Sequence, residues 1–135
     1  MTDFIKILPN YLVKRYQSWK KNEFQKNKRF YKKIANKPQK PQTMVISCCD
    51  SRIHVTSILG AKKGEFFIHR NIGNLIPPYN SNSNDHGTSA AVEYAVNNLK
   101  VSNIIIMGHS NCGGIISGYN LFQKNNKKEK SIFIN

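Results

Sequence analysis

Long apolar runs are absent from this sequence: no stretch approaches the roughly 20 apolar residues that a membrane-spanning helix requires. The first residues, MTDFIK, also lack the apolar segment of a secretory signal peptide. We therefore expect a cytoplasmic protein that has no membrane partner. At 135 residues the chain is long enough for one hydrophobic core but not for two, so we expect a single domain spanning residues 1–135.

Cysteine is scarce. The chain has three cysteines, Cys48, Cys49 and Cys112, and two of them are adjacent. Such a set is a poor framework for disulfide bonds, which small secreted domains build from several well-separated pairs. In a reducing compartment these residues fit metal binding or catalysis better.

Acidic residues are scarce as well, with 7 Asp and Glu against 21 Lys and Arg, which gives a formal net charge of +14. Proteins that bind nucleic acid or anionic surfaces have such a balance. The chain is also rich in Lys, Asn and Ile, however, and this compositional bias explains the charge without any partner. The aromatic and glycine signature of RNA-binding sheets is missing, as is the Cys2His2 finger spacing. We therefore expect no nucleic-acid partner, and a basic nucleic-acid-binding module is the least favoured function.

Residues 4–35 have the periodicity of helices. Apolar residues recur three and four positions apart at Phe4, Ile5, Leu8, Leu12, Tyr16 and Trp19, which places them on one face. Pro9 is expected to mark a helix start or a kink. The other faces carry many Lys and Arg residues, which we interpret as a solvated basic face. We expect an amphipathic arm that packs on another surface, such as a second subunit, and that ends at the proline-containing linker 37–41.

Apolar runs alternate with helical patterns from residue 43 onwards. Strands are expected at 43–47, 65–69 and 103–107, a short helix at 55–59 that ends at Gly60, and a longer helix from Gly87 to Leu99. This alternation predicts an α/β fold with a three-stranded parallel sheet. The third strand is nearly all apolar, as expected when both of its faces are covered.

Metal-binding residue types follow two of these expected strands at the point where each strand ends. Cys48, Asp50 and Arg52 follow the first strand, and His109 and Cys112 follow the third. In open α/β sheets, sites form outside the carboxyl ends of the strands. We therefore predict one zinc site built from Cys48, His109 and Cys112, with Asp50 and Arg52 beside it.

The chemistry of these side chains suits zinc. Thiolate sulfur and imidazole nitrogen are preferred zinc ligands, and three of them leave a fourth position for water, whose pKa zinc can lower to about 7. Asp50 lies two residues after Cys48 and could take that position instead, whereas Arg52 could hold it away through a bidentate pair. We therefore predict that Asp50 and Arg52 form a switch that blocks or frees the fourth ligand position of the zinc ion.

Ordinary structural interpretations of the same residues stay open at this point. A His-x-x-Cys spacing alone is a weak indication of metal, and the segment 50–52 could be only a cap with a surface ion pair. Cys49 is expected to be a small core residue, because it should point opposite to Cys48. Three histidines are expected not to be ligands, His54 because it is exposed and His69 and His86 because they are structural or loop residues.

Four segments resemble the motifs of one enzyme family. They are CCDSR at 48–52, RNIGNLIPPY at 70–79, HGTSAAVEYAV at 86–96 and GHSNCGG at 108–114. In this order and spacing they are similar to the β-class carbonic anhydrases, and the similarity extends over roughly residues 8–120.

The resemblance implies a zinc lyase that interconverts carbon dioxide and bicarbonate, with one zinc ion per chain. Cys48, His109 and Cys112 match the zinc ligands of the family. Asp50 and Arg52 match the pair in which the aspartate either binds zinc or is held off by the arginine. The resemblance further implies that zinc-bound hydroxide attacks carbon dioxide, that bicarbonate leaves and that a proton passes to buffer. It also implies that the N-terminal helices grip a partner subunit, so a homodimer or a higher homo-oligomer is expected.

Within the domain we expect a helical arm at 1–36, a zinc-site core at 43–118 and a basic tail at 123–135. Family members continue past the GHSNCGG motif with further helices and at least one more core strand. We therefore expect a C-terminally truncated domain in which surface of the third strand is exposed. Two functions stay open: an active carbonic anhydrase, and an inactive truncated remnant that binds zinc or a partner subunit.

Overall fold

The structure is a computed structural model that describes residues 8–79 and 87–123. The chain divides into two compact units, Met1–Gln39 and Lys40–Asn135, and each is considered by itself. Within the described residues, no helix combines the length and the apolar character needed to cross a membrane. The predictions for Phe4, Ile5, His86 and the basic tail beyond Gln123 lie outside the described residues.

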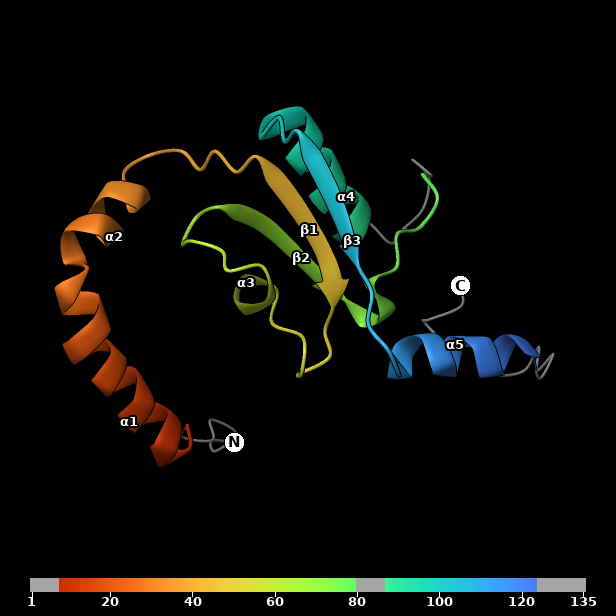
Figure 1. Cartoon of the computed structure of the whole chain (residues 1–135), viewed down its shortest axis with the longest axis horizontal. Helices are drawn as coiled ribbons and strands as arrows, with labels where there is room; N and C mark the ends of the chain where they lie inside the picture. The colour runs from red at the N-terminus through yellow and green to blue at the C-terminus, as the bar shows by residue number, and fades with distance from the viewer. Residues whose placement is uncertain (1–7, 80–86, 124–135) are drawn as a thin grey trace, which may run out of the picture. The chain divides into compact units, whose positions relative to one another are not determined.

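The first unit is a helical arm (Figure 1). Its elements are α1 (Asn10–Trp19), η1 (Lys20–Phe24) and α2 (Lys28–Ala35). Pro9 precedes α1 with φ −52° and ψ 134°, so the helix begins directly after it, as expected. Asn27 interrupts the arm between η1 and α2, with φ −106° and ψ 15°. Its side-chain amide donates to the carbonyl and to the carboxylate of Glu23, both at 3.0 Å, which stabilises the interruption.

Aromatic rings gather along this arm. The ring pairs are Tyr16–Trp19, Trp19–Phe24, Trp19–Tyr31, Phe24–Tyr31 and Phe30–Tyr31, with centroids between 5.3 and 6.1 Å apart. Neither α1, η1 nor α2 contains a buried residue. The apolar side of the arm is therefore only partly covered by its own side chains.

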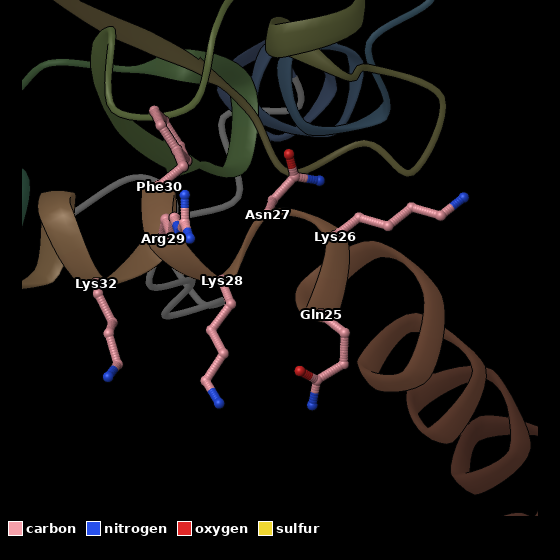
Figure 2. A pocket seen from close by; sticks show the side chains of 7 residues that line it. All are labelled: Gln25, Lys26, Asn27, Lys28, Arg29, Phe30 and Lys32. Carbon is pink, nitrogen blue, oxygen red and sulfur yellow. The ribbon is translucent and has the colours of Figure 1, made fainter.

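A hollow of about 590 Å³ lies beside the interruption at Asn27 (Figure 2). Its lining residues are Gln25, Lys26, Asn27, Lys28, Arg29, Phe30 and Lys32. In Figure 2 the side chains of Lys28 and Lys32 extend to the same side, whereas Lys26 points elsewhere. The lining contains four cationic side chains and no acidic one, which agrees with the expected basic, solvent-facing side of the arm.

The second unit contains a three-stranded parallel sheet, as predicted. Its strands are β1 (Thr43–Cys48), β2 (Phe66–Asn71) and β3 (Asn103–Met107). The order is β2-β1-β3, so β1 is central (Figure 1). Ser47 of β1 is opposite Arg70 on one side and Met107 on the other, which aligns the carboxyl ends of all three strands.

Helices and short turns complete the second unit. They are α3 (Val55–Ile58), η2 (Ile72–Asn74), α4 (Gly87–Glu93), η3 (Tyr94–Asn98) and α5 (Gly113–Gln123). Met44 and Ile46 of β1 form the core with Ala95, and Phe67 and Val92 pack against them. The helix expected before the third strand is therefore present as α4 and η3, and it covers one face of the sheet.

The expectation that both faces of β3 are covered was wrong. Ile104, Ile105 and Ile106 are 44%, 37% and 56% exposed, so its faces are not both covered in the described chain. Among the described residues β3 lies at the edge of the sheet with only β1 as its hydrogen-bonded neighbour, and the buried core is centred on β1 rather than on β3. The companion expectation, that surface of the third strand is exposed, is confirmed.

The second strand also differs from its expected bounds. It extends two residues beyond His69, so Arg70 and Asn71 belong to β2 rather than to the loop that follows. Both continue the pairing with β1, where they lie opposite Ser47 and Cys48. This extension brings the Arg70 side chain beside the end of β1.

Candidate metal centre

The predicted ligands lie together at the carboxyl edge of the sheet, where β1 and β3 end. Cys48 is the last residue of β1, and His109 and Cys112 lie between the end of β3 and the start of α5. Because β1 and β3 are parallel neighbours, both ends meet at the same edge. One potential ligand atom from each of the three residues lies within 4.8 Å of the others.

The two thiols have the spacing that a shared metal ion requires. Cys48 Sγ and Cys112 Sγ are 3.7 Å apart, and neither cysteine is in a disulfide. Two sulfurs that each lie about 2.3 Å from a zinc ion at a tetrahedral angle are about 3.8 Å apart. The side chains are also protected from solvent, since Cys48 is 3% and Cys112 is 6% exposed.

His109 presents one ring nitrogen to this cluster. Its Nδ1 lies 2.9 Å from the carbonyl oxygen of Ser110 and donates to it, which leaves the lone pair on Nε2. Nε2 is buried and has no hydrogen-bond partner among the residues that the structure describes. An unsatisfied buried imidazole nitrogen beside two thiols fits a metal ligand.

Cys48 is placed to carry negative charge. Burial raises the pKa of its thiol, but His109 and the backbone N–H groups of Asp50 and Gly73 outweigh burial and lower this pKa to about 7. Both N–H groups lie 3.4 Å from Sγ. In turn the Cys48 thiol raises the pKa of His109 above its usual value. A thiolate is the form of cysteine that binds metal.

Asp50 and Arg52 form a bidentate pair beside the cluster. Arg52 Nε donates to Asp50 Oδ1 at 2.9 Å, and Nη2 donates to Oδ2 at 2.7 Å. The Arg52 backbone N–H donates to Oδ1 as well, at 3.0 Å. These hydrogen bonds hold the pKa of Asp50 well below its usual range. Asp50 Oδ2 is 4.0 Å from His109 Nε2, so the carboxylate lies next to the cluster while Arg52 holds it.

Cys49, His54 and His69 lie outside the cluster. Cys49 is exposed, so the expectation of a core residue is wrong, because β1 ends at Cys48 and the chain leaves the sheet there. His54 is exposed as expected, and its Nδ1 lies within 3.0 Å of the hydroxyls of Thr56 and Ser57. His69 is structural as expected, since its Nε2 is 3.0 Å from Thr88 Oγ1.

Two features of the site were not predicted from the sequence. Arg70 binds the backbone of the segment that contains Asp50, and Gly73 donates its N–H to Cys48. The signal was present in the RNIGN segment, which directly follows the strand expected at 65–69 and so lies at the same edge of the sheet as the cysteines. The strand expected at 65–69 ends before Arg70, so the sequence pattern alone assigned no role to Arg70 or Gly73.

Gly114 lets α5 approach the turn that holds Gly73. A Cβ at this position would lie 2.5 Å from Ile72 Cγ2 and 3.1 Å from the Gly73 backbone nitrogen. We expect Gly114→Ala to destabilise the fold by about 1–3 kcal/mol, because the backbone at Gly73 cannot move aside as a side chain could. Urea unfolding measures this loss.

The matched control lies in the same helix. A Cβ at Gly118 meets no atom within 4 Å, so Gly118→Ala is expected to leave stability unchanged or to raise it by up to about 1 kcal/mol. Equal stability of the two variants would contradict the close contact at Gly114.

Comparisons with known proteins agree with this geometry. The family model described as carbonic anhydrase matches residues 43–135. Beta carbonic anhydrase 5, chloroplastic, from Arabidopsis thaliana is 43% identical over 104 residues, which cover 77% of this chain and 34% of that relative.

Solved structures show the same likeness. The β-carbonic anhydrase CcaA has a TM-score of 0.77 at 31% identity, covering 87% of this chain and 52% of the other. A structure from a study of two tetrameric β-carbonic anhydrases of the ascomycete Sordaria macrospora has a TM-score of 0.69 at 38% identity, covering 82% and 53%. The chain spans 34–44% of the length of the curated relatives compared.

Proposed function

The chain belongs to the β-carbonic anhydrase family, and from this premise we propose that it binds one zinc ion and catalyses the reversible hydration of carbon dioxide to bicarbonate. The observation that carries the proposal is the cluster of Cys48, His109 and Cys112, with its sulfur separation of 3.7 Å and its unpartnered Nε2. This donor set and this spacing fit zinc.

In the proposed mechanism Cys48, His109 and Cys112 are the metal ligands. A zinc ion supplies the Lewis acid that makes water a nucleophile near neutral pH. Arg52 holds the Asp50 carboxylate through two side-chain hydrogen bonds, and so would keep this oxygen ligand away from a bound zinc ion. Asp50 would be able to bind the ion only if this pair opened. The two residues thus control access of water to the site.

A paired measurement on the purified chain tests the proposal. We expect close to one zinc per chain by elemental analysis, and hydration of carbon dioxide above the buffer rate by stopped flow. A chain that contains zinc but does not hydrate carbon dioxide would refute the proposed enzymatic activity. It would support the second candidate, a chain that binds zinc or a partner subunit without catalysis. The exposure of Ile104–Ile106 on β3 favours that candidate, because it leaves one edge of the sheet that carries the site uncovered. A folded sample without zinc would overturn both versions of the metal site.

We also propose that the chain forms a homodimer or a higher homo-oligomer through its helical arm. Three apolar side chains of the arm, Leu8, Tyr11 and Tyr16, are 65%, 57% and 58% exposed, and no residue of α1 or α2 is buried. The relatives from Sordaria macrospora are described as tetrameric. A cytoplasmic location stays a prediction.

Tyr16→Glu is expected to weaken self-association at least tenfold, because it puts a charge into the aromatic side of the arm. Lys14→Glu changes the basic side of the same helix and is the control, with a smaller expected effect. Sedimentation equilibrium over a range of concentrations measures both. A wild-type chain that stays monomeric at every concentration would refute the proposal.

A further inference from the structure

The Arg70 side chain donates hydrogen bonds to the segment that joins β1 to α3. Its Nε donates to the carbonyl oxygen of Cys48 at 2.9 Å, and its Nη2 donates to the carbonyl oxygens of Asp50 and Ile53, both at 2.9 Å. One side chain from β2 thereby contacts the backbone of the metal-site segment at three points between residues 48 and 53.

The number of donors matches the number of acceptors. Nε carries one hydrogen and Nη2 carries two, so each N–H of this edge of the guanidinium meets one carbonyl oxygen. The Ile53 N–H also donates to the Asp50 carbonyl at 3.0 Å, which closes a tight turn around the Arg70 head group. This turn fixes the direction in which the chain leaves Cys48 and the position from which the Asp50 side chain extends.

We propose that Arg70 is a positioning residue that holds segment 48–53 so that Cys48 and Asp50 keep the geometry of the metal site. The inference rests on the proposed function, and it adds a residue that acts through the backbone rather than on the metal or the substrate. Arg70 is exposed, so its charge is accessible to solvent. Its contribution is therefore the fixed geometry of the hydrogen bonds rather than long-range attraction.

This role requires an arginine. The guanidinium is planar and presents its donors as a rigid fork, so two nitrogens reach three separate carbonyl oxygens. A lysine ammonium would keep the charge but would present all its donors from one nitrogen on a flexible stem. Comparison of Arg70→Lys with Arg70→Gln separates the fork from the charge.

The experiment compares the wild-type chain of 135 residues with both variants after cobalt(II) or zinc loading. Arg70→Gln is expected to lose 10–100-fold in metal affinity, measured by competition with a chelator, as is typical when a group that supports metal ligands is removed. Arg70→Lys is expected to recover only a small part of this loss. Lys62→Gln removes an exposed cation near the opposite end of β2 and is the control, with affinity unchanged.

Hydrogen exchange gives a readout that needs neither metal nor activity. The amides of Arg52 and Ile53 donate to Asp50 and are expected to exchange at least tenfold faster in Arg70→Gln, with the core amides of β1 unaffected. Wild-type affinity and exchange in Arg70→Gln would overturn the proposal. If the Gln variant does not fold, a Lys variant with wild-type affinity and exchange overturns it equally. A wild type that binds metal but does not hydrate carbon dioxide refutes the proposed function and leaves this comparison intact.

If the wild type is active, a double-variant cycle adds a further test. Arg70→Gln should lower kcat in the wild-type background and have a much smaller effect in an Asp50→Asn background, because the two residues act through one geometry. Full additivity of the two effects would show that Arg70 does not act through Asp50, and would overturn that part of the inference.

Discussion

Cys112→Ser is expected to abolish zinc binding and, with it, hydration of carbon dioxide. Cys112 Sγ lies 3.7 Å from Cys48 Sγ and is one of only three donor atoms in the described cluster. A neutral hydroxyl replaces a thiolate, and zinc ligands in proteins are thiolates, imidazoles and carboxylates. We expect the zinc affinity to fall by more than the roughly 10–100-fold that loss of a supporting residue costs.

Elemental analysis after gel filtration measures the zinc, and stopped flow measures hydration on the same sample. The neighbouring Cys49 supplies the matched control, since it is an exposed thiol outside the cluster. Cys49→Ser should keep the zinc and any activity of the wild type. A folded Cys112→Ser chain with a full complement of zinc would show that Cys112 is not a ligand.

The convergence of this cluster could be predicted because it depends on only two facts that the sequence displays. Cys48 ends one apolar strand, and His109 closely follows another. When two such strands are parallel neighbours, their carboxyl ends must meet. The spacing of His109 and Cys112 then brings the third group to the same place, whatever the details of the turn.

Other features depended on information that periodicity does not contain. The pattern of Ile104–Ile106 shows that β3 is apolar but not that it lies at the edge of the sheet, so its exposure could not follow from the pattern alone. Cys49 was expected inside because alternation was extended one residue past the end of β1. Where a strand ends is set by pairing with its neighbours, which is a tertiary property.

The contacts of the Arg70 side chain could not be predicted from the sequence either. Its three acceptors are backbone carbonyl oxygens, and no residue type in the sequence marks a carbonyl as free to accept. The contact exists because β2 extends to Asn71 and places Arg70 opposite Ser47. Residues that act on metal or substrate by their own chemistry are therefore visible in a sequence, whereas those that act on the backbone become visible only in the fold.

Arg52→Ala is expected to retain zinc and lose hydration activity by on the order of 100-fold, the size typical of misplacing one group at a reaction centre. The variant removes both side-chain hydrogen bonds that hold the Asp50 carboxylate, whose Oδ2 is already 4.0 Å from His109 Nε2. Loss of Arg52 also lets the pKa of Asp50 rise toward its usual value near 3.9, which is still far below neutral pH. Asp50 therefore remains an anion at pH 7 and is free to take the fourth ligand position.

Removing the Asp50 carboxylate as well tests whether this side chain causes the loss of hydration activity in Arg52→Ala. In Arg52→Ala with Asp50→Ala no group is left to close the site, so hydration should recover in part relative to Arg52→Ala alone. Arg52→Lys should lie between Arg52→Ala and the wild type, because an ammonium can pair with the carboxylate without the bidentate geometry. The absorption spectrum of the cobalt(II) form follows the same change without relying on turnover, since replacement of water by a carboxylate alters the ligand field. Wild-type activity in Arg52→Ala, or a double variant no more active than the single one, would mean that Arg52 does not act by holding Asp50 away. The pair seen in the structure would then be an ordinary surface ion pair, the interpretation that the sequence alone had left open.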